Sequence, residues 1–190
     1  MSTTLSVLSP EEKIKLLSYS GQINYRDYIM IKLALLTGIR NSECVQLTVF
    51  CIAPYGTVYN YLEIPNVIAK RGQGRSLPLH PDLKHDLTEF LSWKFKNKEE
   101  IETGSALFVS ARAKKQLNTR DFHRIVYTHS LNSIGRPIHP HTLRHTFATE
   151  LLSKSNLAIV QEALGHKSIQ STQIYLHPST NDVLKAINQL

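Results

Sequence analysis

The segment with the clearest capacity for chemistry is HPHTLRHTFATELL, residues 139–152. Pro140 suits the first turn of a helix, and spacings of three and four residues would place His141, Arg144 and His145 on one face. An arginine can hold two oxygens of an anion through its planar guanidinium, and a histidine can exchange a proton near neutral pH. The segment therefore predicts a helix that binds and activates an oxyanion.

Two other interpretations of this segment remain open from its residue types alone. The polar residues could be the solvated face of an ordinary amphipathic helix whose apolar side packs inward. His141 and His145 also have the i, i+4 spacing of a zinc-binding helix, but the glutamate that follows the first histidine in zinc proteases is missing. We therefore expect no metal ion at this segment.

The composition favours a polyanionic partner. The 190 residues contain 22 Lys and Arg against 15 Asp and Glu, a formal charge of +7, and lysines and arginines that neutralise phosphates release condensed counterions. The length suits one domain. Cys44 and Cys51 are too few and too isolated for a disulfide framework or a zinc site. No signal peptide or membrane span is recognisable, so we expect a cytoplasmic, nucleoid-associated protein without a membrane partner.

The elements that must position these residues are mostly helices. Ser9 and Pro10 begin a helix that ends near Gly21, a second helix runs from Asn24 to Thr37, and Gly38 ends it. Further helices are expected over 42–47, 81–97, 119–133, 141–153, 156–164, 168–176 and 180–190. Residues 58–64, 67–69 and 75–79 are predicted as strands, with a turn at 72–74. The predicted fold is mainly α with a small three-stranded antiparallel sheet.

Four sequence motifs in a fixed order resemble those of the tyrosine recombinase (phage integrase) family. HPHTLRHTFATELL resembles the family's HxxRH box. LTGIRNSECVQL, residues 36–47, resembles its first-arginine box, and LGHKSIQSTQIYLH, residues 164–177, resembles its C-terminal box. VIAKRGQGRSLPL, residues 67–79, resembles the hairpin that carries the catalytic lysine. The resemblance covers nearly the whole chain and implies the DNA breaking-rejoining enzyme fold.

The resemblance implies a site-specific recombinase or integrase that cuts and rejoins DNA through a 3′-phosphotyrosyl intermediate, without metal or ATP. The implied catalytic residues, in chain order, are Arg40, Lys70, His141, Arg144, His166 and Tyr175. Tyr175 would be the nucleophile, the arginines would hold the phosphate, and Lys70 would protonate the leaving 5′-oxygen. His141 would assist proton transfer, and His166 would hydrogen-bond a phosphate oxygen. Glu43 would orient Arg40 or His141, and His145 would have a neighbouring, supporting role.

Some assignments have competitors in the sequence. Arg71 and Arg75 lie close to Lys70 and compete with it for the role of general acid. For DNA contact outside the catalytic centre, the candidates are basic residues of the hairpin, of the helix expected from residue 119 and of the loop before that helix: Arg71, Arg75, Lys114, Lys115, Arg120 and Arg124.

The resemblance also implies an organisation on DNA. Residues 1–190 would form a single catalytic domain, with residues 179–190 as a C-terminal tail helix and without the N-terminal core-binding domain of typical members. The sequence suits either a catalytic fragment or a naturally minimal recombinase. The expected partners are double-stranded DNA with inverted half-sites and further copies of the chain, from dimer to tetramer. Val183, Leu184, Ile187 and Leu190 give the tail an apolar side that would dock on a neighbouring copy or fold back on its own domain.

Two other functions share part of this pattern. A type IB topoisomerase uses the same chemistry, but its motif strings differ from HTLRHTFAT and TQIY. A regulatory DNA-binding module that has lost catalysis would not be expected to keep all six catalytic residues.

Overall fold

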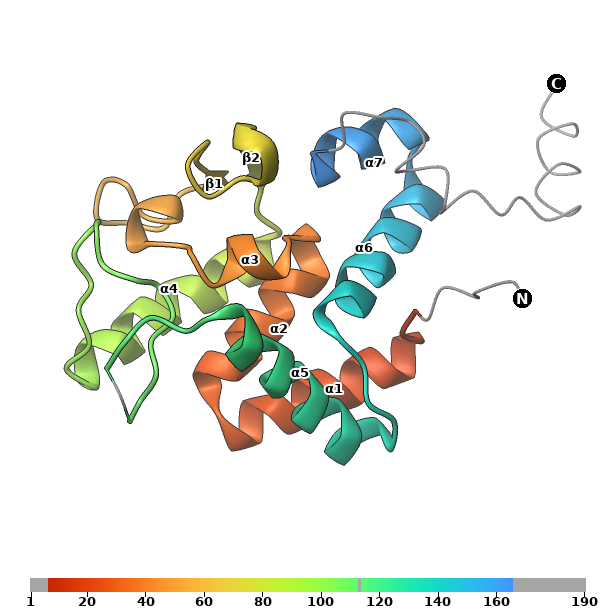
Figure 1. Ribbon diagram of the computed structural model, residues 1–190, viewed down its shortest axis with the longest axis horizontal. Helices are drawn as coiled ribbons and strands as arrows, with labels where there is room; N and C mark the ends of the chain where they lie inside the picture. The colour runs from red at the N-terminus through yellow and green to blue at the C-terminus, as the bar shows by residue number, and fades with distance from the viewer. Residues whose placement is uncertain (1–6, 113, 166–190) are drawn as a thin grey trace, which may run out of the picture.

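The computed structural model describes residues 7–112 and 114–165, without the side chain of Arg71. This part of the chain is mainly helical and carries one small antiparallel sheet (Figure 1). Its helices are α1 (Pro10–Ile23), α2 (Tyr25–Thr37), α3 (Asn41–Cys44), α4 (Pro81–Lys96), α5 (Thr119–Ile134), α6 (Pro140–Lys154) and α7 (Leu157–Leu164). Its strands are β1 (Tyr61–Ile64) and β2 (Arg75–Pro78), and the short 3₁₀ helices are η1 (Val49–Cys51) and η2 (Lys70–Gly72).

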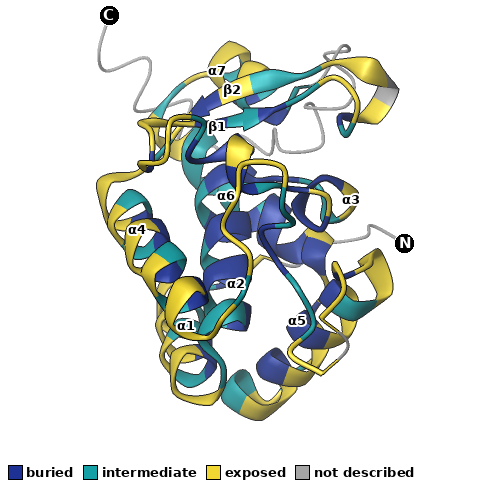
Figure 2. Cartoon of the chain, turned by 90° about the vertical axis from the view of Figure 1, so that its left-hand side faces the viewer, coloured by how far each residue is buried: buried dark blue, intermediate teal, exposed yellow. Residues whose placement is uncertain are grey.

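Helix α2 is the centre of the fold. It packs against α1, α4 and α6, and Ile29, Met30, Ile31 and Leu33 are fully buried on it. Buried residues lie on most sides of α2. Helix α4, in contrast, is exposed along its outer side (Figure 2). A helix that is apolar on most sides has to be enclosed by others. Helix α6, which carries the HxxRH motif, is thereby fixed against the core.

The helix boundaries follow local signals in the sequence. Ser9 caps α1 in a reciprocal capping box with Glu12, and Pro10 occupies the first turn. Gly38 ends α2 in the left-handed conformation, with φ of 60°, which costs glycine little. A side chain at this position would also collide with Phe147 of α6. The end of α2 and the middle of α6 therefore come into close contact.

The sheet has two strands in the described part of the chain, where the sequence predicted three. Tyr61 pairs with Pro78 and Ile64 with Arg75, but residues 67–69, predicted as a strand, form turns. The reason is local: the carbonyl of Pro65 accepts hydrogen bonds from the backbone of Ile68 and Ala69, which bends the chain directly after β1. The predicted middle strand is instead part of a ten-residue connection, residues 65–74, that carries Lys70.

The other predicted elements agree with the structure to within a few residues at their ends. The predicted helix over 42–47 is the short α3 followed by a turn. The helices expected over 168–176 and 180–190 lie outside the described residues. Figure 1 shows the β1–β2 hairpin and α7 on the same side of the helical body, where the candidate site is found.

Candidate active site

Helix α6 presents Arg144 to two backbone carbonyls from different parts of the chain. The Arg144 side chain is almost fully buried, its residue being 5% exposed. It donates one hydrogen bond from Nη1 to the carbonyl of Gly38 and another from Nη2 to the carbonyl of Leu164, at 2.9 Å. Both acceptors lie at helix C-termini, where carbonyls lack partners within the helix and the helix dipole has its negative end. The ends of α2 and α7 thus fix the arginine's orientation.

Arg40 meets the same end of α7. Its Nη2 donates to the carbonyl of Gly165 at 3.2 Å, one residue beyond the carbonyl that Arg144 uses. Its Nη1 donates to the Glu43 carboxylate at 2.8 Å, and the Arg40 side chain is 18% exposed. Two arginines from distant segments are therefore held by consecutive carbonyls, and their positive charges lie side by side.

Glu43 connects Arg40 to a third arginine, Arg75. The Glu43 side chain is fully buried and accepts two hydrogen bonds from Arg75, at 3.1 and 2.8 Å. Burial acts to raise the pKa of Glu43, but the hydrogen bonds and charge of Arg75 and the hydrogen bonds from Arg40 outweigh it and hold the pKa at about 2. Glu43 is therefore ionised at all physiological pH values and carries a permanent negative charge inside the site.

His141 lies in a strongly positive environment. Partial burial lowers its pKa below the ordinary 6.5, and the charges of Arg144, Lys70 and Arg40 lower it further. Lys70 is exposed, at the start of η2 in the β1–β2 connection. Because all three cations act on one imidazole, the structure gathers Arg40, Lys70, His141 and Arg144 at one place. Such a cluster can bind a phosphate and keep a histidine neutral near pH 7.

His145 lies one turn further along α6. Its ring centroid is 6.3 Å from that of His141, and burial, His141 and Arg144 all lower its pKa. Within residues 7–112 and 114–165 the structure has no grouping of three or more His, Cys, Asp or Glu side chains suited to a metal ion.

The residues expected to contact DNA have different positions. Lys114 and Lys115 are exposed in the loop before α5, and Arg120 and Arg124 are exposed on α5. Arg124 also donates to Asp121 at 3.2 Å. Arg75 differs from the expectation, because its side chain is 7% exposed and bound to Glu43. The side chain of Arg71 lies outside the described part.

His166 and Tyr175 also lie outside the described residues. The last described residue, Gly165, directly precedes His166, and its carbonyl accepts the Arg40 hydrogen bond. The sequence reasoning missed the carbonyls of Gly38, Leu164 and Gly165 as arginine acceptors. Glycines that end helices at positions 38 and 165 were the available signal, but a carbonyl's partner depends on how distant helices meet.

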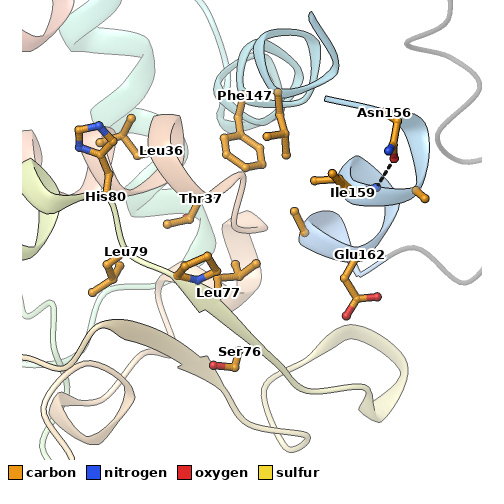
Figure 3. Close-up of a pocket in the computed structure, with 14 residues that line it drawn as sticks. Leu36, Thr37, Ser76, Leu77, Leu79, His80, Phe147, Asn156, Ile159 and Glu162 are labelled. Carbon is orange, nitrogen blue, oxygen red and sulfur yellow. Dashed lines mark hydrogen bonds between the residues drawn. The ribbon is translucent and has the colours of Figure 1, made fainter. Parts of the chain in front are cut away.

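A largely apolar groove of about 720 Å³ adjoins the site (Figure 3). Leu77 of β2, Leu36 of α2, Phe147 of α6 and Ile159 of α7 line it. Ile159 is 49% exposed, so part of this lining faces solvent. The polar residues around the groove include Ser76, His80, Asn156 and Glu162. The groove shares α7 and β2 with the arginine cluster.

Among the helices in the described ranges, none has the length and apolar character needed to cross a bilayer.

Comparison with known proteins gives several similar sequences. The chain is 34% identical over 185 residues to a tyrosine recombinase of Pseudothermotoga lettingae, covering 96% of this chain and 60% of that protein. It is 32% identical over 188 residues to tyrosine recombinase XerD of Staphylococcus epidermidis, covering 96% of this chain and 61% of the relative. The chain thus spans about three fifths of the length of these relatives.

Solved structures show the same fold. The crystal structure of XerA recombinase superposes with a TM-score of 0.79 at 24% identity, covering 96% of this chain and 64% of that one. XerH site-specific recombinase bound to its difH substrate has a TM-score of 0.75 at 26% identity, covering 98% of this chain and 55% of that one. The model of the phage integrase family matches residues 6–182. With that match over most of its length, the chain belongs to the phage integrase family.

Proposed function

We propose that residues 1–190 form a single catalytic domain of a site-specific DNA recombinase, with Tyr175 as its nucleophile. The observation that carries the proposal is the pair of arginines, Arg40 and Arg144, held on consecutive carbonyls at the end of α7 beside His141 and Lys70. His166 follows that helix end directly in the sequence, and Tyr175 follows nine residues later.

The reaction is a transesterification at a DNA phosphodiester. The Tyr175 oxygen attacks phosphorus, a 3′-phosphotyrosyl bond forms, and the bond to the 5′-oxygen breaks. Arg40, Arg144 and His166 stabilise the charge on the non-bridging oxygens in the transition state. The 5′-hydroxyl of a partner strand then attacks phosphorus and displaces Tyr175. Because the phosphodiester is exchanged for a phosphoester of similar energy, the cycle needs no ATP. It needs no metal ion because the arginines and His166 offset the charge that a metal ion would otherwise offset.

Two protons must move in the cleavage step. The lowered pKa of His141 keeps its imidazole neutral at pH 7, the form that can accept the proton of the tyrosine hydroxyl. Lys70 lies on the exposed β1–β2 connection and donates a proton to the leaving 5′-oxygen. His145 supports His141 from the next turn of α6.

The substrate is double-stranded DNA with inverted half-sites. The net charge of +7 and the exposed cations on α5 and in the loop before it support this proposal. Arg120, Arg124, Lys114 and Lys115 then contact the duplex outside the catalytic centre, and Arg71 does so from the hairpin. The XerH site-specific recombinase, whose structure was solved bound to its difH substrate, is consistent with such a complex.

Copies of the chain assemble on the DNA through the C-terminal tail. The apolar side of residues 179–190 needs a place to bury, and the groove between α7 and β2 is an apolar site next to the catalytic centre (Figure 3). We place the tail of one copy in this groove of its neighbour, giving dimers to tetramers.

The decisive experiment uses a nicked suicide duplex that carries the native half-sites. The wild-type protein should form a covalent adduct that survives denaturing electrophoresis, in the presence of EDTA and without ATP. Tyr175→Phe should bind the same duplex with unchanged affinity and form no adduct, because it lacks the attacking oxygen.

Tyr55→Phe is the matched control, because Tyr55 is 84% exposed and lies outside all four motifs. It should form the adduct at the wild-type rate. An adduct that persists in Tyr175→Phe would remove Tyr175 as the nucleophile. Relaxation of supercoiled DNA lacking any specific site at a similar rate would favour a topoisomerase instead.

A further inference from the structure

Arg75 is almost completely withdrawn from solvent, although its sequence position on the hairpin suggests a DNA-facing cation. Its side chain is 7% exposed, and its Nη1 and Nη2 each donate to one oxygen of Glu43, at 3.1 and 2.8 Å. A guanidinium that meets a carboxylate through two parallel hydrogen bonds has a fixed orientation. Arg75 is thus committed to Glu43.

The charges of this cluster explain what Arg75 can contribute. Arg40 and Glu43 alone would form a neutral pair, because the one negative charge of Glu43 would balance the one positive charge of Arg40. With Arg75 present, two guanidinium groups share one carboxylate, and the cluster carries one net positive charge. Glu43 then holds the guanidinium of Arg40 through Oε1 and its backbone N–H through Oε2, without cancelling the charge of Arg40.

Gly165, at the end of α7, contacts both Arg75 and Arg40. The Arg75 side chain packs on Gly165, so that a Cβ added there would lie 3.0 Å from Cδ and 3.3 Å from Nη1 of Arg75. The carbonyl of the same glycine accepts the hydrogen bond from Arg40. Arg75 therefore touches both groups that orient Arg40, the carboxylate and the end of α7.

We propose that Arg75 is a positioning residue that acts through Glu43, holding Arg40 in a geometry and charge state that leave its guanidinium able to bind the scissile phosphate. This inference rests on the proposed function, because it concerns the phosphate-binding arginine of that reaction. It also replaces DNA contact as the role of Arg75.

The test compares Arg75→Met in two backgrounds, wild type and Glu43→Gln, at saturating suicide substrate. In the wild-type background the substitution should slow adduct formation roughly 10- to 100-fold, the range for losing charge-assisted hydrogen bonds. In the Glu43→Gln background it should change the rate less than about 2-fold, because the group through which Arg75 acts is already gone. Arg75→Lys should be intermediate, since it keeps the charge and loses the paired geometry.

Binding measurements and a control variant distinguish a positioning role of Arg75 from direct contact with DNA. The affinity for the duplex should stay within about 2-fold of wild type, and its salt dependence should be unchanged. If Arg75 contacted DNA, Arg75→Met would weaken binding to the duplex. The rate of adduct formation would then fall by the same factor in both backgrounds. Arg136→Met is the matched control, because it breaks an arginine–glutamate pair, with Glu12, away from the site. It should leave the rate of adduct formation unchanged.

A second readout does not depend on cleavage. The side-chain Nε–H signal of Arg40 in NMR spectra of the full chain, assigned by its loss in Arg40→Lys, should shift in Arg75→Met. The shift should be much smaller when Arg75→Met is made in the Glu43→Gln background. If the wild type formed no adduct, the proposed function would fail and this signal would still decide the inference. If the Arg40 signal does not shift when Arg75→Met is made in the wild-type background, the positioning role of Arg75 is refuted.

Discussion

Glu43 shows most clearly how the surroundings of one residue control its charge. Its carboxylate is removed from water, which opposes ionisation, yet Arg75 and Arg40 keep its pKa at about 2. Since this is below the ordinary 4.5, ionisation of Glu43 stabilises the folded state fully above pH 4.5. That stabilisation declines as the pH falls below 4.5 and is lost once the pH has fallen through the folded-state value.

Glu43→Gln should therefore lower the free energy of unfolding by about 3 kcal/mol near neutral pH, and by less near pH 3. Urea unfolding of wild type and variant at a series of pH values measures the difference. Glu89→Gln, at an exposed position on α4, should change the unfolding free energy little at any of these pH values. A Glu43→Gln defect that is independent of pH would mean that lost packing, and not the charge, causes it.

At the scale of elements, the C-terminal end of α7 organises the site. Its last carbonyls accept hydrogen bonds from Arg144 and Arg40, and Gly165 adopts a left-handed conformation with φ of 60°. A helix end provides unpaired carbonyls and a partial negative charge, which is what two neighbouring cations require. The end of the short helix α7 therefore fixes the orientation of both arginines.

Gly165→Ala should reduce adduct formation on the suicide substrate by roughly 10-fold or more, because its methyl group displaces Arg75 and alters the acceptor for Arg40. Gly135→Ala is the matched control. Gly135 has φ of 74° at the end of α5, and a Cβ there would meet no atom within 4 Å. Both variants should lose about 1–2 kcal/mol of stability from backbone strain. Equal cleavage rates in the two variants would refute the role given to the α7 end.

At the scale of the whole molecule, the groove and the arginine cluster share the same two elements. Helix α7 and strand β2 both line the groove. The arginine cluster uses Arg75 of β2 and the carbonyls of Leu164 and Gly165 at the end of α7. A tail bound in the groove would therefore touch the elements that support Arg40. This places the proposed contact between copies directly beside the catalytic centre.

Ile159→Lys should weaken cooperative assembly on a duplex with two half-sites by roughly 10-fold, because it places a charge in an apolar groove. Binding to a single half-site should not change, and removal of residues 180–190 should give the same defect. Ile14→Lys is the control, since Ile14 is 69% exposed on α1 and does not line the groove. Band-shift titrations on both duplexes measure the effect. Unchanged cooperativity in Ile159→Lys would exclude the groove as the docking site.

The sequence alone determined the class of protein and most of the helices. The capping residues Ser9 and Pro10, the apolar run of α2 and the terminating Gly38 act through neighbours in the chain, so their effect is readable from local order. The motif strings likewise pointed to the family, which the match over residues 6–182 then confirmed. The predicted strand over 67–69 was wrong, because its run of apolar residues does not reveal the turn that the Pro65 carbonyl closes.

Only the tertiary structure decided which groups meet. Arg40 and Gly165 are 125 residues apart in the chain, and Arg75 and Glu43 are 32 apart, so no local pattern links them. Whether a cation faces DNA or a buried carboxylate depends on how β2, α3 and α7 pack around a common core. The sequence could name the cationic residues of the site, but burial and long-range hydrogen bonds separated the arginine that we assign to phosphate, Arg40, from the one that supports it, Arg75.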